Sequence, residues 1–300
     1  MYDIVIVGAG PAGLTAALYA RRANKSVLLI EKSTFGGQVT YSPKIENYPG
    51  FLQMSGMEFA DQLVDQVLEQ GADMEMAKVT GIRPAENGWA VITESKEYEA
   101  KAVILATGVE HRMLGLPGET KFVGHGISFC AVCDGAFYRD KTVAVIGGGN
   151  SALQEALLLT ENCKKVIVVQ NLPAFTGEER LIQLLKQKEN VECIFNSVSK
   201  ELLGENSLTG LVIENTKGET RTLEIDGLFI AIGLIPKNDA FKDFADLNSY
   251  GYFDSDEACV TKTNGLFVAG DCRSKSIRQI TTAAADGAVA ALAACKYIDG

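Results

Sequence analysis

The sequence is poor in basic residues. Its 28 lysines and arginines face 38 aspartates and glutamates, which gives a formal net charge of −10 at pH 7. Nonspecific nucleic-acid binding requires clustered positive charge, so this balance argues against it. No apolar run is long enough to cross a membrane, and the apolar residues 1–7 lack the basic flank and cleavage site of a signal peptide. We expect neither a nucleic-acid nor a membrane partner.

Histidine and regularly spaced cysteine are also scarce. The two histidines, His111 and His125, lack the spacing of metal ligands, so we expect no metal site. The seven cysteines are an odd number without the spacing of a disulfide framework, which favours a reducing, cytoplasmic location. A content of 47% hydrophobic and 22% charged residues is typical of a globular protein, and 300 residues allow one large domain or two ordinary ones.

The most informative stretch is a Cys-x-x-Cys pair, Cys130 and Cys133, followed directly by Asp134. Two thiols at this spacing can close into a reversible disulfide, and such settings lower the thiol pKa that controls exchange. The adjacent carboxyl group can supply or accept the proton that a leaving thiolate requires. The alternative is half of a zinc site, but structural zinc usually has two such pairs and the sequence has no second one. The pattern favours redox chemistry.

A dinucleotide-binding pattern opens the chain. We expect a buried strand over 4–7, the loop Gly8-Ala9-Gly10-Pro11-Ala12-Gly13, and a helix over 14–23. Glycines in a G-x-G-x-x-G loop let backbone N–H groups approach a pyrophosphate at the helix N-terminus. The next expected strand, 26–30, ends at Glu31, where a carboxylate would hold the ribose hydroxyls. Strand, loop, helix, strand and acid together predict a bound dinucleotide.

The second half of the chain repeats this pattern. An expected strand over 142–146 leads into Gly147-Gly148-Gly149-Asn150-Ser151-Ala152, followed by a helix to about residue 162 and a strand over 166–169. Residues 227–232, before Gly233, echo the expected strand over 102–107 that precedes Gly108. An internal duplication of this kind predicts a second nucleotide-shaped fold, whether or not it still binds a nucleotide.

Taken together, these motifs resemble the flavoproteins with two dinucleotide-binding domains, and specifically the low-molecular-weight thioredoxin reductases. The resemblance runs from residue 4 to about residue 294. It implies an α/β protein of two Rossmann-like domains, the three-layer ββα flavoprotein fold, with the second domain inserted in the first. The FAD-binding domain would comprise residues 1–111 and 243–300, and the redox-disulfide domain, with a fold like that of NAD(P)H domains, residues 112–242. The resemblance also implies bound FAD, thioredoxin as substrate and a homodimer.

The resemblance also suggests roles for individual residues. Cys133 would be the sulfur that faces the flavin, Cys130 would attack the disulfide of thioredoxin, and Asp134 would be the general acid. Further segments look like FAD contacts, among them Gly36-Gly37-Gln38, Glu46-Asn47-Tyr48, Ala106-Thr107-Gly108, Gly270-Asp271 and Arg278-Gln279-Ile280. The expected FAD-binding residues are Gly8, Gly10, Pro11, Ala12, Gly13, Glu31, Gly37, Gln38, Asn47, Thr107, Gly108, Gly270, Asp271, Arg278, Gln279 and Ile280.

The second repeat departs from the family at the end of its second strand. NADPH-dependent relatives carry His-Arg-Arg and a later Arg there to hold the 2′-phosphate, whereas this chain has Gln170, Asn171, Leu172 and Thr176. A charge-assisted hydrogen bond contributes about 1.5–3 kcal/mol, so losing two or three weakens NADPH binding by roughly 3–6 kcal/mol, or about 10²–10⁴ in affinity. An acid that would select NADH is also missing. NADPH binding is therefore doubtful, although Arg180 and nearby lysines offer a substitute.

A donor other than a nicotinamide has a precedent in the resemblance, the ferredoxin-dependent flavin thioredoxin reductases. Flavin accepts single electrons from an iron–sulfur protein and passes two to a disulfide. Transfer from a ferredoxin near −400 mV to a thioredoxin near −270 mV is downhill by roughly 6 kcal/mol per electron pair. An acidic enzyme meeting an acidic ferredoxin needs a local basic patch. Two groups are candidates: Arg21, Arg22 and Lys25, or Arg273, Lys275 and Arg278.

Three functional hypotheses stay open from the sequence. The first is a thioredoxin reductase that receives electrons from reduced ferredoxin. The second is an NAD(P)H-dependent thioredoxin reductase with an atypical cofactor clamp. The third belongs to another class, a flavin-binding redox sensor that does not turn over. The intact Cys-Ala-Val-Cys-Asp stretch argues against the third.

Overall fold

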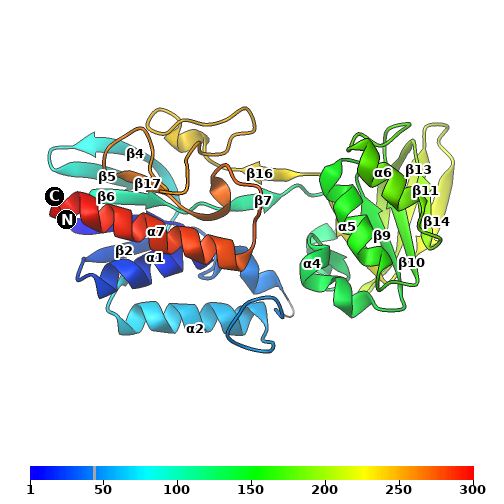
Figure 1. Cartoon of the computed structure of the whole chain (residues 1–300), viewed down its shortest axis with the longest axis horizontal. Helices are drawn as coiled ribbons and strands as arrows, with labels where there is room; N and C mark the ends of the chain where they lie inside the picture. The colour runs from blue at the N-terminus through cyan, green and yellow to red at the C-terminus, as the bar shows by residue number, and fades with distance from the viewer. Residues whose placement is uncertain (43–44) are drawn as a thin grey trace. The chain divides into compact units, whose positions relative to one another are not determined.

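The computed structural model describes residues 1–42 and 45–300. The chain forms two compact units, one of residues Met1–Glu110 and Ile235–Gly300 and the other of His111–Leu234 (Figure 1). The second junction differs from the expected one at 242/243 because Phe241 packs in the core of the first unit, with its ring 6.3 Å from that of Phe253. The chain passes between the units in β7 (Val109–His111) and β16 (Leu234–Pro236), which pair as a two-stranded sheet.

The first unit is built on a sheet in which β3 (Asp73–Met76), β2 (Val27–Glu31), β1 (Tyr2–Val7) and β6 (Glu97–Leu105) run parallel in that order. β17 (Leu266–Val268) pairs with the carboxyl-terminal half of β6. The hairpin of β4 (Val79–Ala85) and β5 (Gly88–Thr93) pairs with the other half, antiparallel. Gly88, at the start of β5, has a positive φ of +134°, which suits the tight turn of this hairpin.

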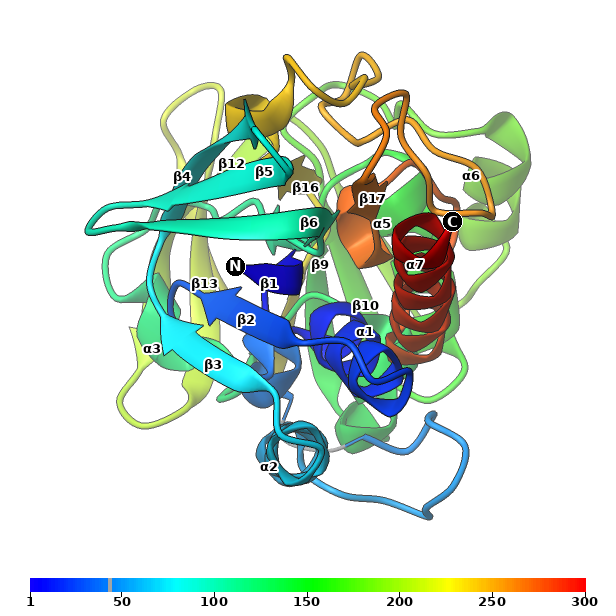
Figure 2. The ribbon, with the colours of Figure 1, turned by 90° about the vertical axis from the view of Figure 1, so that its left-hand side faces the viewer.

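Both faces of this sheet are covered. Ile4, Ile6 and Leu29 face the cluster that includes α1 (Pro11–Arg22) and α7 (Ile280–Asp299), while alternate residues such as Val5 and Val7 pack toward Trp89 and Phe253. Figure 2 shows α1 and α7 side by side against one face of the sheet. Their contact is close because Gly287 lies against the backbone of Ala12, where a Cβ atom would come within 2.2 Å of the carbonyl oxygen.

The remaining elements of this unit are short, apart from one helix. They are η1 (Gly37–Tyr41), α2 (Gly56–Glu69), η3 (Asp239–Phe241) and η4 (Gly270–Cys272). α2 begins at a capping box, in which Ser55 Oγ accepts the N–H of Glu58 and the Glu58 carboxylate accepts the N–H of Ser55. No helix among residues 1–42 and 45–300 is long and apolar enough to cross a bilayer.

The second unit repeats the plan. Its parallel sheet has the order β11 (Val191–Ile194), β10 (Lys165–Val169), β9 (Thr142–Ile146), β15 (Gly227–Ile230) and β8 (Ile127–Ser128). α5 (Asn150–Thr160) and α6 (Glu179–Lys186) pack with one face, and an antiparallel sheet of β12 (Ser197–Gly204), β13 (Leu208–Asn215) and β14 (Thr220–Glu224) packs with the other. α3 (Glu119–Phe122), α4 (Ala131–Asp134) and η2 (Gly135–Tyr138) lie in the segment before β9. The predicted α/β class and duplication are confirmed.

Candidate active site and cofactor-binding loops

The expected FAD residues gather at the carboxyl ends of parallel strands. Gly8 follows β1, Glu31 ends β2, Thr107 follows β6 and Asp271 follows β17, all in the first unit. Gly8 has φ +103°, and a Cβ atom there would come within 2.3 Å of the carbonyl oxygen of Ala106. Ligands of open α/β sheets bind at this edge. The described backbone therefore forms a loop of the kind the sequence predicts.

The loop before α1 is shaped to approach a phosphate. Gly10 is the N-cap of α1 and Pro11 is its first residue, while Gly13 sits so close to Gly8 that a Cβ atom would lie 1.8 Å from the Gly8 carbonyl oxygen. The Gly10 position itself is open, since a Cβ there would meet only the Gly36 carbonyl at 3.9 Å. Open backbone at a helix N-terminus suits a pyrophosphate.

Glu31 fixes this loop from the next strand. Its carboxylate accepts the N–H of Ala9 at 2.8 Å and the N–H and Oγ–H of Ser33 at 3.0 and 3.2 Å, and its side chain is buried. A carboxylate has about four lone-pair sites, so acceptor capacity remains for a ribose hydroxyl pair. The turn beyond it is also held, because Gly36 N–H donates to the Ala9 carbonyl at 2.7 Å, and η1 begins there with Gly37 and the exposed Gln38.

Asp271 is the clearest sign of a polar ligand. Its Oδ1 atom is buried without a hydrogen-bond partner among the described residues, and burial raises the pKa of the carboxyl group to about 6, against an opposing effect of Lys275 and Arg278. A buried unpaired acceptor is costly, so its presence indicates a donor supplied from outside the chain. The ribityl hydroxyls of FAD, expected here from the resemblance, are donors of that kind.

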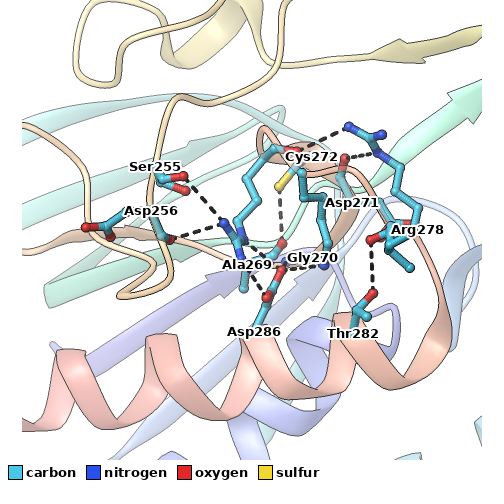
Figure 3. A network of polar contacts seen from close by, with 12 residues as sticks. Ser255, Asp256, Ala269, Gly270, Asp271, Cys272, Arg278, Thr282 and Asp286 are labelled. Atoms are coloured by element: carbon cyan, nitrogen blue, oxygen red, sulfur yellow. Dashed lines mark hydrogen bonds and ion pairs between the residues drawn. The ribbon is translucent and has the colours of Figure 1, made fainter.

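A buried ionic network holds the turn that carries Asp271 (Figure 3). Asp286 of α7 accepts two hydrogen bonds from Arg273, at 2.8 and 2.9 Å, one from Lys275 at 2.8 Å and one from the N–H of Gly270 at 3.0 Å. The Arg273 and Lys275 side chains are only 5% and 8% exposed. They are therefore unavailable for the surface basic patch that the sequence suggested.

Other expected residues lie near this turn. Arg278 donates to the Asp271 carbonyl at 3.2 Å and stacks 4.2 Å from the Tyr252 ring centroid. Asn47 donates to Gln279 Oε1 at 3.2 Å, so two segments far apart in sequence meet. Ile280 packs with the cluster around Phe59. Gly270 lies against Ala12, with a built Cβ atom 2.8 Å from that of Ala12.

Sequence reasoning missed the residue that fixes Thr107. The Thr107 hydroxyl donates to Asn238 Oδ1 at 2.8 Å, and the Asn238 amide donates to the carbonyls of Gly251 and Cys272, both at 2.9 Å. Asn238 is 1% exposed, so these bonds are made away from water. Gly108 follows with φ +65°. A lone Asn in a loop gives no local signal of such a role.

The redox pair forms in the second unit as the sequence predicts. Cys130 and Cys133 are joined in a disulfide with their Cα atoms 5.3 Å apart, and Cys130 is the N-cap of the one-turn helix α4. The N–H of Cys133 donates to Cys130 Sγ at 3.2 Å. An amide aimed at this sulfur stabilises a thiolate there. Val132, between the two cysteines, is 54% exposed, which puts this turn at the surface of its unit.

Asp134 is held beside the pair by Ser128. Ser128 Oγ donates to Asp134 Oδ2 at 2.6 Å and accepts the N–H of Cys130 at 3.2 Å. Asp134 Oδ1 is buried without a partner among the described residues, and burial raises the pKa of this carboxyl group, against the lowering effect of Ser128. A raised pKa suits a carboxyl group to the role of a general acid.

In the second glycine loop, residues 147–152, neighbouring segments of the chain occupy hydrogen-bonding positions around Gly148. The Gly148 carbonyl accepts the N–H groups of Thr176 and Gly177 at 2.8 and 3.1 Å. The buried Gln170 side chain lies against Gly148, accepts the N–H of Asn171 at 3.1 Å and donates to the Ala174 carbonyl at 3.4 Å. The Gln170 side chain therefore makes its hydrogen bonds to the backbone of residues 171–174.

Comparisons with known proteins agree with this architecture. Residues 2–287 match the family model described as pyridine nucleotide-disulphide oxidoreductase. The thioredoxin reductase of Bacillus subtilis is 38% identical over 301 residues, covering 100% of this chain and 95% of the relative. A Clostridium pasteurianum protein named "34.2 kDa protein in rubredoxin operon" is 41% identical over 99% of this chain and 97% of its own length. The chain belongs to the low-molecular-weight thioredoxin reductase family.

A solved structure supports the same family. The crystal structure of thioredoxin reductase from Streptococcus pyogenes is 40% identical, covers 100% of this chain and 98% of its own, and superposes with a TM-score of 0.94. Members of this family are FAD-dependent oxidoreductases, and this chain is therefore a flavoprotein enzyme. The open Gly10 loop, the Glu31 carboxylate and the unpaired Asp271 oxygen fit FAD.

Proposed function

We propose that this protein reduces thioredoxin through the Cys130–Cys133 pair with electrons from reduced ferredoxin. The observation that carries the choice of donor is the lack of a cation after β10. Residues 170–179 contain two carboxylates and no lysine, arginine or histidine, and the first basic residue beyond them is Arg180. The 2′-phosphate of NADPH requires such cations, because phosphate recognition rests on charge-assisted hydrogen bonds.

The side chains of Gln170 and Thr176 also support the proposal, because each already forms hydrogen bonds within the chain. Gln170 stands where the first repeat has Glu31, but it uses its amide within the loop that follows β10. Leu172 is 44% exposed and its side chain has no hydrogen-bonding group, and the Thr176 hydroxyl donates to the Gly148 carbonyl. In this proposal the second nucleotide-shaped fold is retained as the scaffold of the redox pair.

Different residues of the chain have separate roles in the proposed reaction. FAD, when bound, takes up single electrons and delivers a pair to the disulfide. We propose that Gly8–Gly13, Glu31 and Asp271 hold it, with Gly37, Gln38, Asn47, Thr107, Gly108, Gly270 and Arg278–Ile280 as further contacts. Cleavage of the disulfide leaves Cys133 as the flavin-facing sulfur and Cys130 as the thiolate that attacks thioredoxin. Asp134 then protonates the departing thiolate of thioredoxin.

Two further parts of the proposal concern the setting of the enzyme. We propose a homodimer, as the family resemblance implies, which analytical ultracentrifugation would test. We also propose a cytoplasmic location. Five cysteines, Cys163, Cys193, Cys259, Cys272 and Cys295, are free, and unpaired thiols persist in reducing compartments.

The deciding measurement is anaerobic bleaching of the flavin absorption band of the FAD-loaded protein. NADPH, NADH and photoreduced ferredoxin are added in separate cuvettes. We expect rapid bleaching with ferredoxin and none at micromolar NADPH or NADH. Fast bleaching by micromolar NADPH would contradict the choice of donor and would mean that residues outside 171–176 bind the 2′-phosphate.

Two variants sharpen this experiment. The triple variant Asn171→Arg, Leu172→Arg and Thr176→Arg restores the cations, and we expect its NADPH affinity to rise by about 10²–10⁴. Cys133→Ser should keep FAD but abolish thioredoxin reduction, which separates an enzyme from a redox sensor that does not turn over. Retained turnover in Cys133→Ser would show that the disulfide is not the route of the electrons.

A further inference from the structure

A second carboxyl group lies at the redox disulfide and has no role in the mechanism described so far. Glu155 projects from α5, which packs against α4. Its Oε2 atom accepts the N–H of Ala131, the first residue of α4, which lies between the two cysteines. Glu155 is thus bonded directly to the Cys-x-x-Cys turn, 24 residues away in the sequence.

The surroundings of Glu155 favour its protonated form. Burial raises the pKa of this carboxyl group to about 7, the hydrogen bond from Ala131 opposes the rise, and the nearby Asp134 carboxylate adds to it. Asp134, the residue after Cys133 and the last residue of α4, is itself buried. Two buried carboxyl groups therefore belong to the same small turn, and the charge of Asp134 disfavours ionisation of Glu155.

No positively charged group near α5 offsets the raised pKa of Glu155 among the residues the structure describes. α6 contributes Glu179, Arg180 and Lys186, which are exposed to solvent. Lys165 of β10 pairs with Glu192 at 2.6 Å. Asp134 of α4 is the group whose charge acts on Glu155 among the residues the structure describes. A thiolate formed at the cysteines would add a further negative charge next to this pair.

We propose that Glu155 is a proton-holding residue of the redox site, which takes up a proton when the Cys130–Cys133 disulfide is reduced. The step balances as follows: the disulfide and the Glu155 carboxylate take two electrons and two protons, and yield one thiol, one thiolate and a neutral Glu155. The sulfur–sulfur bond breaks, the reduced flavin supplies the electrons and water supplies the protons. Neutral Glu155 then lets a reactive thiolate persist beside Asp134.

This inference rests on the proposed redox cycling of the disulfide, but its test requires neither thioredoxin nor the electron donor. The FAD-loaded protein is labelled with ¹³C-glutamate, and its disulfide is reduced with dithiothreitol at pH 7.5. We expect the reduced-minus-oxidised infrared spectrum to gain a protonated-carboxyl C=O band that shifts with the ¹³C label. This band should be lost in Glu155→Gln, which retains an acceptor for the Ala131 N–H.

A matched control and a chemical readout complete the test. Glu161→Gln removes an exposed carboxylate near the end of the same helix, where it pairs with Lys188, and should keep the band. Because Glu155 is neutral in the reduced protein, the neutral Glu155→Gln should alkylate Cys130 with iodoacetamide at pH 8 at about the wild-type rate. The proposal would be overturned if the wild-type protein showed no ¹³C-sensitive carboxyl band, or if Glu155→Gln kept that band. Failure of the wild-type protein to reduce thioredoxin would instead count against the proposed function alone.

Discussion

Burial sets the proton affinity of Asp271 and thereby links cofactor binding to the stability of the apoprotein. The pKa of this carboxyl group is raised by burial from 3.8 to about 6. Because the folded-state pKa lies above the unfolded one, the resulting stabilisation is fully present below pH ~4 and is lost as the pH rises through ~6. A shift of about two units corresponds to roughly 3 kcal/mol.

We therefore expect Asp271→Asn to stabilise the apoprotein relative to wild type at pH 8 by up to ~3 kcal/mol, with a much smaller difference at pH 4. Urea unfolding of both apoproteins at the two pH values measures this difference. The same variant should release FAD faster, because Asp271 is proposed to accept hydrogen bonds from the ribityl hydroxyls and the variant removes its charge. Asp254→Asn, at an exposed position of the same unit, is the control. A pH-independent difference would contradict the account.

The sequence revealed some site residues and concealed others for a physical reason. Gly8, Glu31 and the Cys130–Cys133 pair belong to local patterns, since a tight turn, a strand end and a small disulfide ring each require particular residues at fixed spacing. Glu155 and Asn238 act through partners 24 and 131 residues away. Such pairings arise from the packing of helices and loops, so no pattern in a single sequence marks them.

At the scale of elements, α7 stabilises the loop before it through one carboxylate. Among the described residues, Asp286 is the one ion-pair partner of both Arg273 and Lys275, and all three side chains are nearly inaccessible to water. Removing one partner of a buried pair leaves an uncompensated charge, which costs about 3–5 kcal/mol. The turn that carries Gly270 and Asp271 depends on this contact.

We expect Asp286→Asn to lower the free energy of unfolding by about 3–5 kcal/mol and to speed the release of FAD. Chemical denaturation and the fluorescence of released FAD measure the two effects. Asp246→Asn breaks the exposed pair with Lys262 in the same unit and should cost less than ~1 kcal/mol. Equal stability of the two variants would show that the buried network does not hold the loop.

The bounds of helices and strands were predicted more accurately from the sequence than the boundary between the two units. α1 and β2 lie within a few residues of their predicted ranges, because the glycine loop and the buried strand run define them. The junction after the second unit was predicted at 242/243, whereas the structure has it at 234/235. The difference arises from tertiary packing. No local sequence pattern marks Phe241 as a core residue, yet it packs in the same hydrophobic cluster as residues of β5 and β6.

At the scale of the whole molecule, net charge affects the encounter with the ferredoxin that we propose as donor. The net charge is −10, and one of the two candidate basic groups is lost because Arg273 and Lys275 are buried with Asp286. In the other group, Arg21 donates to the carbonyls of Gln70 and Lys25, and Lys25 pairs with Asp299, so Arg22 is its most exposed member. Long-range repulsion should therefore dominate the approach of an acidic ferredoxin.

We accordingly expect kcat/KM for reduced ferredoxin to rise when the ionic strength increases from 0.01 M to 0.15 M. The Debye length then falls from about 30 Å to about 8 Å, so salt screens the repulsion between the two acidic proteins. Stopped-flow bleaching of the flavin band across this range measures the effect, with a small uncharged photochemical reductant as the control, whose rate should be unchanged. A rate that falls with salt would mean that a local basic surface steers ferredoxin, and loss of that fall in Arg22→Gln would place the surface at the end of α1.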